Sequence, residues 1–274
     1  MEKIFFLLLI LLCFTTPIIS IESKWREYSA CQYGRLQSPI ELNEYDSTYS
    51  NKFSFVYQYY KASSTKTIHT DYTYYWEIDE GNFVNFEKEG VIKQYELNKI
   101  EVYPGTHTID GNTGNFEIHL VHKKNLDFNS NKNQYRKIVD ANMYLVVVLR
   151  YRTDCSNLAC ISDNGLLSDL ENTGSNTIDL NKYPIFQDKR AYLYEGSFLY
   201  TPCDENVNYY VVNDFFHSDV QPENLDDSTP ISQKDRYGRP ILKNFMNYKE
   251  FLGSEFYSMN IFYLIFMMVI LFVI

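Results

Sequence analysis

Histidines and a glutamate lie close together in one stretch of this 274-residue chain and could bind a metal ion. His107 precedes a turn, and Glu117, His119 and His122 follow it in an otherwise apolar segment. Neutral imidazole and carboxylate are both ligands that Zn²⁺ accepts in proteins. On an extended strand, however, His119 and His122 point to opposite faces, so they cannot share one ion without a bulge. We therefore expect structural, hydrogen-bonded histidines here, and an unconventional metal site is the alternative.

The cysteines form a second group with possible chemistry. Cys13 lies in a predicted leader, and the remaining four are an even number, which in an oxidising compartment suggests two disulfides. Four cysteines allow three pairings. The short spacing between Cys155 and Cys160 suits the closure of a small loop, which leaves Cys31 with Cys203. A zinc cluster is the competing interpretation, but the sequence contains no C-x-x-C pair.

An apolar segment near the N-terminus predicts the compartment. The basic Lys3 is followed by the unbroken apolar residues 4–14 and then by the small residue Ser20. This order is typical of a secretory signal peptide. We expect residues 1–20 to be removed and the rest of the chain to enter the secretory pathway.

A second apolar segment, residues 261–274, contains no charged residue. As a helix it would rise about 21 Å, or about 28 Å counted from Phe256, against a hydrocarbon core of roughly 30 Å. The small residues Gly253 and Ser254 lie upstream, which is the arrangement of a GPI-attachment signal. We expect residues 256–274 to be such a signal, with a retained membrane helix or a buried core element as alternatives. In the first two cases the domain is tethered at the cell surface.

Composition limits the partners and the fold. The chain has 25 basic and 35 acidic residues, a net charge of -10, which argues against nucleic acid because that partner demands a basic surface. The aromatic content of 17% favours sheet, and the lack of repeats or long linkers favours one domain over residues 22–250. The expected strands cover residues 53–60, 71–78, 83–86, 95–102, 115–122, 143–150 and 209–216, with a short helix at 165–171.

Three sequence patches have the order and spacing of a known family. They are residues 31–42 (CQYGRLQSPIEL), 107–122 (HTIDG and EIHLVH) and 196–203 (GSFLYTPC). They resemble the C-x-G-x-x-Q-S-P-I, E-x-H-L-V-H and G-S-x-T-x-P-P-C segments of the alpha-class carbonic anhydrases. The resemblance implies an α+β, sheet-dominated fold with a central mixed, mostly antiparallel sheet of about ten strands and short peripheral helices. It also implies the Cys31–Cys203 disulfide.

The resemblance implies a zinc site for CO₂ hydration, from which this chain departs. Active members hold Zn²⁺ with three neutral histidines, which lowers the pKa of the bound water to about 7. Two of these ligands lie at positions i and i+2 of one strand. Counted back from Pro104 and His107, they fall on Ile100 and Val102, whose aliphatic side chains have no lone pair to offer zinc. Only His119 matches a ligand position.

Other catalytic positions differ as well. The family's threonine that orients the zinc-bound hydroxide aligns with Leu199, its glutamate partner with Thr106, and its proton-shuttle histidine, loosely, with Asn82. By resemblance, His107 and Glu117 surround the metal ligands or form part of the core. Because of these departures from the family pattern, we predict neither catalytic residues nor a cofactor in this chain, and we expect zinc only if the alternative given below holds.

From these observations we predict a pseudoenzyme: a catalytically inactive carbonic-anhydrase-like extracellular domain that acts as a binding or structural module. Its partner is an unidentified extracellular molecule, and Tyr103 and Tyr200 at the rim of the residual cleft could serve recognition. The alternative is an active zinc lyase that hydrates CO₂ to bicarbonate with ligands other than those assigned here. That alternative requires three histidines to converge within about 2.1 Å of a common point.

Overall fold

The computed structural model describes the central part of the chain. The residues that it describes are 34–59, 61–68, 74–126, 128, 142–156, 159–162, 165–171, 177–183, 190–200, 202–222, 225 and 238–245.

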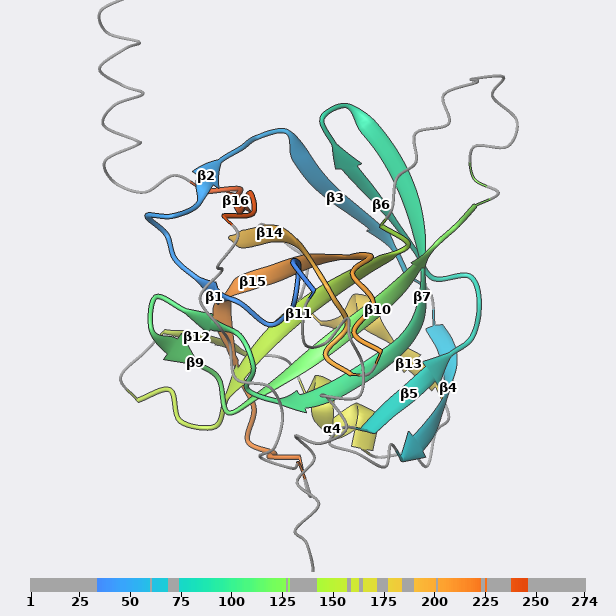
Figure 1. The fold of residues 1–274 in the computed structure, drawn as a ribbon. Helices are drawn as coiled ribbons and strands as arrows, with labels where there is room; N and C mark the ends of the chain where they lie inside the picture. The colour runs from blue at the N-terminus through green and yellow to red at the C-terminus, as the bar shows by residue number, and fades with distance from the viewer. Residues whose placement is uncertain are drawn as a thin grey trace, which may run out of the picture.

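Most of these residues form one curled sheet of thirteen strands (Figure 1). Its main path follows the order β13 (Thr177–Asp179), β4 (Lys61–Ile68), β5 (Tyr74–Ile78), β7 (Val91–Pro104), β10 (Phe116–Lys124), β11 (Tyr144–Arg152), β15 (Val207–His217), β14 (Ala191–Gly196), β16 (Leu242–Lys243) and β2 (Thr48–Tyr49). Off this path, β12 (Cys160–Ser162) pairs with β15, and β6 (Phe83–Lys88) pairs with β7 and with β3 (Phe53–Gln58). A separate sheet has the order β1 (Glu41–Leu42), β8 (Thr108–Ile109) and β9 (Asn112–Thr113).

The large sheet is mixed and mostly antiparallel, as predicted. Its parallel pairs are β11 with β15, β12 with β15, and β16 with β2. The described helical segments are the α-helix α4 (Leu166–Glu171), at the foot of the sheet in Figure 1, and the short 3₁₀ helix η1 (Leu180–Lys182). The fold class and the helix expected at 165–171 are confirmed.

The central strands β10 and β11 are buried on both faces. Alternate residues of each strand enter two different hydrophobic clusters: Ile118, Leu120 and Val147 belong to the larger cluster, and Val146 and Val148 to the smaller one. A strand covered on both sides needs apolar residues in unbroken series, which explains why the sequence of β11 reads YLVVVLRYR. The polar residues of β10 are therefore placed inside the protein, where each must find a partner.

All seven predicted strands correspond to observed ones, namely β3, β5, β6, β7, β10, β11 and β15. β4 is not among them because its sequence, KASSTKTI, is mostly polar and has no apolar alternation.

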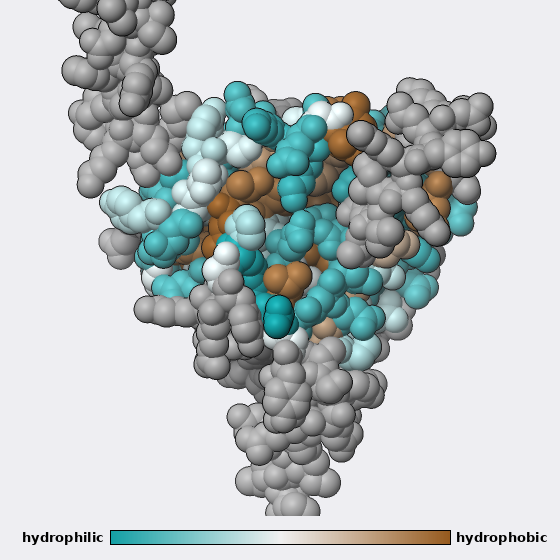
Figure 2. Space-filling view, turned by 45° about the horizontal axis from the view of Figure 1, so that its top comes forward, coloured by the Kyte–Doolittle hydropathy of each residue, from teal (hydrophilic) through white to brown (hydrophobic). Residues whose placement is uncertain are grey.

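The face of the molecule in Figure 2 mixes polar surface with small apolar patches, as is usual for a folded domain.

The Cys155–Cys160 disulfide is confirmed, with a Cα–Cα distance of 5.9 Å, and Cys203 is also disulfide-bonded. Its predicted partner Cys31, the predicted signal peptide (1–20) and the apolar tail (256–274) lie outside the described residues. No helix in the described part of the chain is both long and apolar enough to cross a membrane.

Candidate active site

Glu117 is the centre of a buried polar network. Its Oε1 accepts the backbone N–H groups of Thr106 (3.1 Å) and His107 (2.6 Å). Its Oε2 accepts the Thr106 hydroxyl (2.6 Å) and lies 2.9 Å from both His107 Nδ1 and His119 Nε2. Burial opposes ionisation of Glu117, but the two histidines outweigh it and hold the pKa of the carboxyl well below its usual value. Glu117 is therefore a buried carboxylate with its lone pairs occupied.

Two chain segments position this network. Glu117 and His119 are two residues apart on β10, so their side chains leave the same face of the strand. Thr106 and His107 follow the end of β7, where Gly105 passes close to residue 114: a Cβ on Gly105 would collide with the carbonyl oxygen of Gly114. Because Gly105 has no side chain, the backbone can pass close enough to Gly114 for the N–H groups of Thr106 and His107 to reach Glu117.

The second nitrogen of His107 is also occupied. His107 Nε2 lies 2.7 Å from the hydroxyl of Tyr194, whose ring stacks on that of Tyr209 at 5.0 Å. Burial lowers the pKa of His107 and outweighs the opposite effect of Glu117, so the imidazole is neutral. Its Nδ1–H then donates a hydrogen bond to Glu117, and its Nε2 accepts a hydrogen bond from the Tyr194 hydroxyl. Tyr194 comes from β14, far along the chain, and no sequence motif pointed to it.

The register of β7 against β10 decides which residues lie beside His119. His119 pairs with Glu101, whereas Val102 pairs with Ile118 and Ile100 with Leu120. Paired residues of neighbouring strands share a face, so Ile100 and Val102 point away from His119 into the larger hydrophobic cluster.

This register corrects the predicted place of Ile100 and Val102 in the old ligand site. The alignment by motif counts residues along the chain, but the face of each side chain is set by packing of the strand. A shift by one residue moves every side chain to the other face. Here the aliphatic residues take the core face, and Lys99, Glu101 and Tyr103 take the face of His119.

These three residues of β7 form a closed polar cluster with Tyr200. Lys99 Nζ lies 2.5 Å from Glu101 Oε1 and 3.1 Å from the Tyr200 hydroxyl. The Tyr103 hydroxyl donates to Glu101 Oε2 at 3.1 Å, and the Tyr103 ring is 4.7 Å from that of His119. Burial would lower the pKa of Lys99, but the ion pair with Glu101 and the contact with Tyr200 raise it, so Lys99 is an ammonium ion. The spacing K-x-E-x-Y is the signal that sequence reasoning missed.

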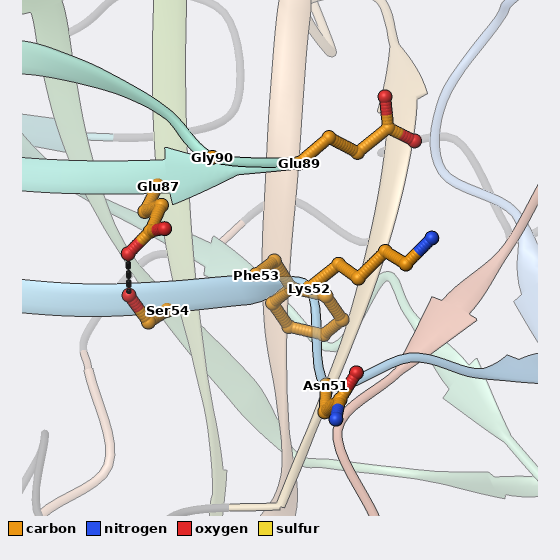
Figure 3. Close-up of a pocket in the computed structure, with 7 residues that line it drawn as sticks. All are labelled: Asn51, Lys52, Phe53, Ser54, Glu87, Glu89 and Gly90. Carbon is orange, nitrogen blue, oxygen red and sulfur yellow. Dashed lines mark hydrogen bonds between the residues drawn. The ribbon is translucent and has the colours of Figure 1, made fainter.

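This cluster leaves little access to His119. The exposed fractions are 1% for His119, 1% for Tyr103 and 3% for Glu101. A pocket in the described part of the chain lies elsewhere, at the β3–β6 edge, where Lys52, Glu87 and Glu89 line it (Figure 3). His119 is thus enclosed by side chains of the chain itself.

The remaining predicted positions lie in the core. Leu199 is buried in the loop after β14, and Asn82 is buried before β6, with its carbonyl accepting the Leu97 N–H at 2.7 Å. His122 does not join His119: its Nε2 lies 2.6 Å from the Tyr59 hydroxyl and its Nδ1 lies 3.1 Å from the Leu145 carbonyl. Burial lowers the pKa of His122 to about 4, so this histidine is neutral.

Comparison with known proteins identifies the family to which this fold belongs. The family model of the eukaryotic-type carbonic anhydrases matches residues 20–253. The chain belongs to this family. The predicted family is therefore confirmed over nearly all of the sequence.

Two plant carbonic anhydrases are among its curated relatives. Alpha carbonic anhydrase 8 of Arabidopsis thaliana is 28% identical over 196 residues, which cover 68% of this chain and 46% of that protein. Alpha carbonic anhydrase 4 of Arabidopsis thaliana is 24% identical over 193 residues, which cover 68% of this chain and 63% of that protein. The match thus spans less than two thirds of the length of either relative.

Solved structures share the carbonic anhydrase fold. The alpha-carbonic anhydrase from Thermovibrio ammonificans, in complex with the inhibitor sulfanilamide, has a TM-score of 0.57 and 20% identity, covering 79% of this chain and 91% of that one. Dioscorin complexed with ascorbate has a TM-score of 0.55 and 20% identity, covering 81% and 91%. At this identity the likeness shows the fold.

The zinc ion of active carbonic anhydrases does not fit the residues of this family member. His107, Glu117 and His119 have ligand-type atoms within 4.8 Å of one another. However, Glu117 already binds one nitrogen of each histidine, and Tyr194 binds the other nitrogen of His107. Only Nδ1 of His119 then has a lone pair to offer, and the facing residue Glu101 is neutralised by Lys99. One imidazole beside an ammonium ion is a poor site for a dication.

Proposed function

We propose that this chain is a carbonic-anhydrase-like domain without CO₂ hydration activity, which works as a binding or structural module outside the cell. One observation carries the proposal: the residue paired with His119 is Glu101, held in a buried ion pair by Lys99. The charge that a zinc ion would supply is replaced by an ammonium group that belongs to the chain itself.

The chemistry of hydration supports this interpretation. A zinc-bound water reaches a pKa of about 7 because neutral ligands leave the ion its positive charge. Here a single histidine of the expected set remains, and Leu199 has no hydroxyl to orient a bound hydroxide. Thr106 donates its hydroxyl to Glu117 and so is already engaged. No step of the hydration reaction can be assigned to these residues.

A second candidate function is zinc-dependent hydration through unconventional ligands. It is favoured by the family and by the close approach of His107, Glu117 and His119. For this to occur, zinc would have to displace the protons shared between Glu117 and the two histidines.

One experiment separates the two candidates. The purified ectodomain is refolded or expressed with excess zinc, dialysed, and assayed for CO₂ hydration with and without a sulfonamide inhibitor. We expect the rate of the buffer alone, and the same rate for His119→Ala. A sulfonamide-sensitive rate that is lost in His119→Ala contradicts the proposal and establishes the second candidate. Circular dichroism of both proteins controls for folding.

We further propose that the domain is delivered by a signal peptide at residues 1–20 and tethered at the cell surface through residues 256–274, which act as a GPI-attachment signal or as a membrane helix. The GPI form of this anchor is tested by phosphatidylinositol-specific phospholipase C on intact cells. Release of the protein supports the lipid anchor, and retention supports a membrane helix. The binding partner is then sought among extracellular molecules, because a net charge of -10 disfavours nucleic acid.

A further inference from the structure

A second site of possible chemistry lies at the C-terminal end of β15, around the Cys155–Cys160 disulfide. Both half-cystines line a surface pocket together with Asp154, Ser162 and His217. Cys155 lies in a turn in which the Ser156 N–H donates to Asp154 at 2.9 Å, and Cys160 begins β12. Both half-cystines are half-buried; Cys155 lies between the exposed residues Asp154 and Ser156, whereas Cys160 is held in the sheet.

The strand register places a histidine on the same face as Cys160. Cys160 pairs with Phe215 and Ser162 pairs with His217, and residues two apart on a strand share a face. The intervening Ile161 packs against the larger hydrophobic cluster on the opposite face. The side chains of Cys160 and His217 therefore leave the sheet on the side away from that cluster.

Two arginine side chains, Arg150 and Arg152, lie beside this face. Arg150 pairs with Phe215 and Arg152 with His217 on the neighbouring strand β11. Their guanidinium groups lie over the Phe215 ring, 4.1 Å and 4.4 Å from its centroid. A cationic neighbourhood stabilises a thiolate over a thiol.

The acidic groups at this site are more exposed. The Asp219 side chain is 93% exposed and lies 3.7 Å from His217 Nε2. Asp154 is exposed, and its pKa is lowered by the Ser156 hydrogen bonds and, to a smaller degree, by Arg152 and His217. Water screens both carboxylates, so they offset the arginines only in part.

We propose that Cys155–Cys160 is a redox-active disulfide that exchanges with low-molecular-weight thiols, with Cys160 as the leaving group and His217 as its proton donor. In the first step a thiolate attacks the sulfur of Cys155, the Cys155–Cys160 bond breaks, and Cys160 leaves as a thiolate that takes a proton from His217. In the second step another thiolate attacks the external sulfur that is bonded to Cys155, this mixed disulfide breaks, and Cys155 leaves as a thiolate that takes a proton from water. Two thiols are then oxidised to one disulfide, and the two cysteines are reduced.

The buried half-cystine Cys203 provides an internal control, because it is disulfide-bonded and has an exposed fraction of 0%. The folded protein is incubated with reduced glutathione as the probe, quenched with iodoacetamide and mapped by mass spectrometry. We expect Cys155 and Cys160 to become reduced at least about tenfold faster than Cys203, since attack requires access to sulfur. We also expect the transient glutathione adduct on Cys155. Equal rates, or an adduct on Cys160, overturn the proposal.

A pair of variants tests the role of His217. In the reduced protein, the rate of Cys160 alkylation against pH should report a thiol pKa below the ordinary value of about 8.5. His217→Gln should raise that pKa and slow the exchange severalfold, whereas Lys88→Gln, which removes a cation from a different strand, should change neither. An ordinary thiol pKa in the parent protein, or a profile that His217→Gln leaves unchanged, overturns the role of His217. Matching circular dichroism spectra show that the variants are folded.

Discussion

Replacing Lys99 by methionine tests the buried ion pair that Lys99 forms with Glu101, the residue opposite His119. The variant Lys99→Met keeps most of the side-chain volume but removes the cation beside Glu101, whose carboxylate still accepts the hydrogen bond of the Tyr103 hydroxyl. The side chains of Lys99 and Glu101 are 19% and 4% exposed, so the pair is largely buried. Removing one partner of a buried pair costs about 3–5 kcal/mol. Because Lys99 keeps some contact with water, we expect the lower end, about 3 kcal/mol.

Urea unfolding at pH 7 measures this loss, and thermal unfolding should show a fall in Tm of roughly 6–12 °C for a domain of this size. Lys88→Met is the matched control: Lys88 pairs with Glu195, but the two side chains are 29% and 46% exposed. For that exposed pair we expect about 0–1 kcal/mol.

The double variant Lys99→Met/Glu101→Met tests whether the loss in Lys99→Met comes from leaving the Glu101 carboxylate without its cation. Exchanging a whole buried ion pair for apolar groups of similar volume is often neutral, so the double variant should lie within about 1 kcal/mol of the parent. If Lys99→Met is as stable as Lys88→Met, or if the double variant is no more stable than Lys99→Met, the ion pair does not have the energetic role assigned to it.

Three further perturbations follow from the network around β10. Glu117→Gln places N–H donors where the existing donors need an acceptor oxygen, and it should cost at least about 2 kcal/mol in urea unfolding at pH 7. The lowered pKa of Glu117 adds stability to the parent protein that is present above the unfolded pKa of about 4.3 and is lost as the pH falls below that value. The variant has no carboxyl at this position and should lack this pH dependence. The pKa of His122, lowered to about 4, adds stability that is complete above the unfolded value of about 6.5 and lost as pH falls towards 4, a change of about 3 kcal/mol that His122→Asn should abolish in a pH series of unfolding curves. Gly105→Ala should destabilise the domain by more than about 2 kcal/mol in thermal unfolding, because its Cβ meets the Gly114 carbonyl; an unchanged Tm would refute that contact.

Much of the fold follows from local sequence. The strands of the central sheet are runs of β-branched and aromatic residues, and the segments 107–122 and 196–203 carry the family pattern. Those signals depend on residues near one another in the chain, so they can be recognised without a structure. Short strands such as β16 and polar ones such as β4 have no such signal, because the sheet that they join determines them.

The site was harder to predict because it depends on register. Motif spacing counts from His107 back to Ile100 and Val102, but the pairing of β7 with β10 places Glu101 opposite His119 and turns Ile100 and Val102 to the other face of the strand. Likewise, the contact of His107 with Tyr194 joins residues 87 positions apart. Which residue faces His119 is therefore decided by packing of the two faces of the sheet.

Zinc binding tests the central claim most directly. The purified domain is dialysed against a zinc-buffered solution at neutral pH, and bound zinc is measured per chain by mass spectrometry of the metal. We expect far less than stoichiometric zinc, and no rise in Tm on adding the ion, because the residue opposite His119 is Glu101, which is held in an ion pair by Lys99. Stoichiometric zinc that is lost in His119→Ala would contradict the account.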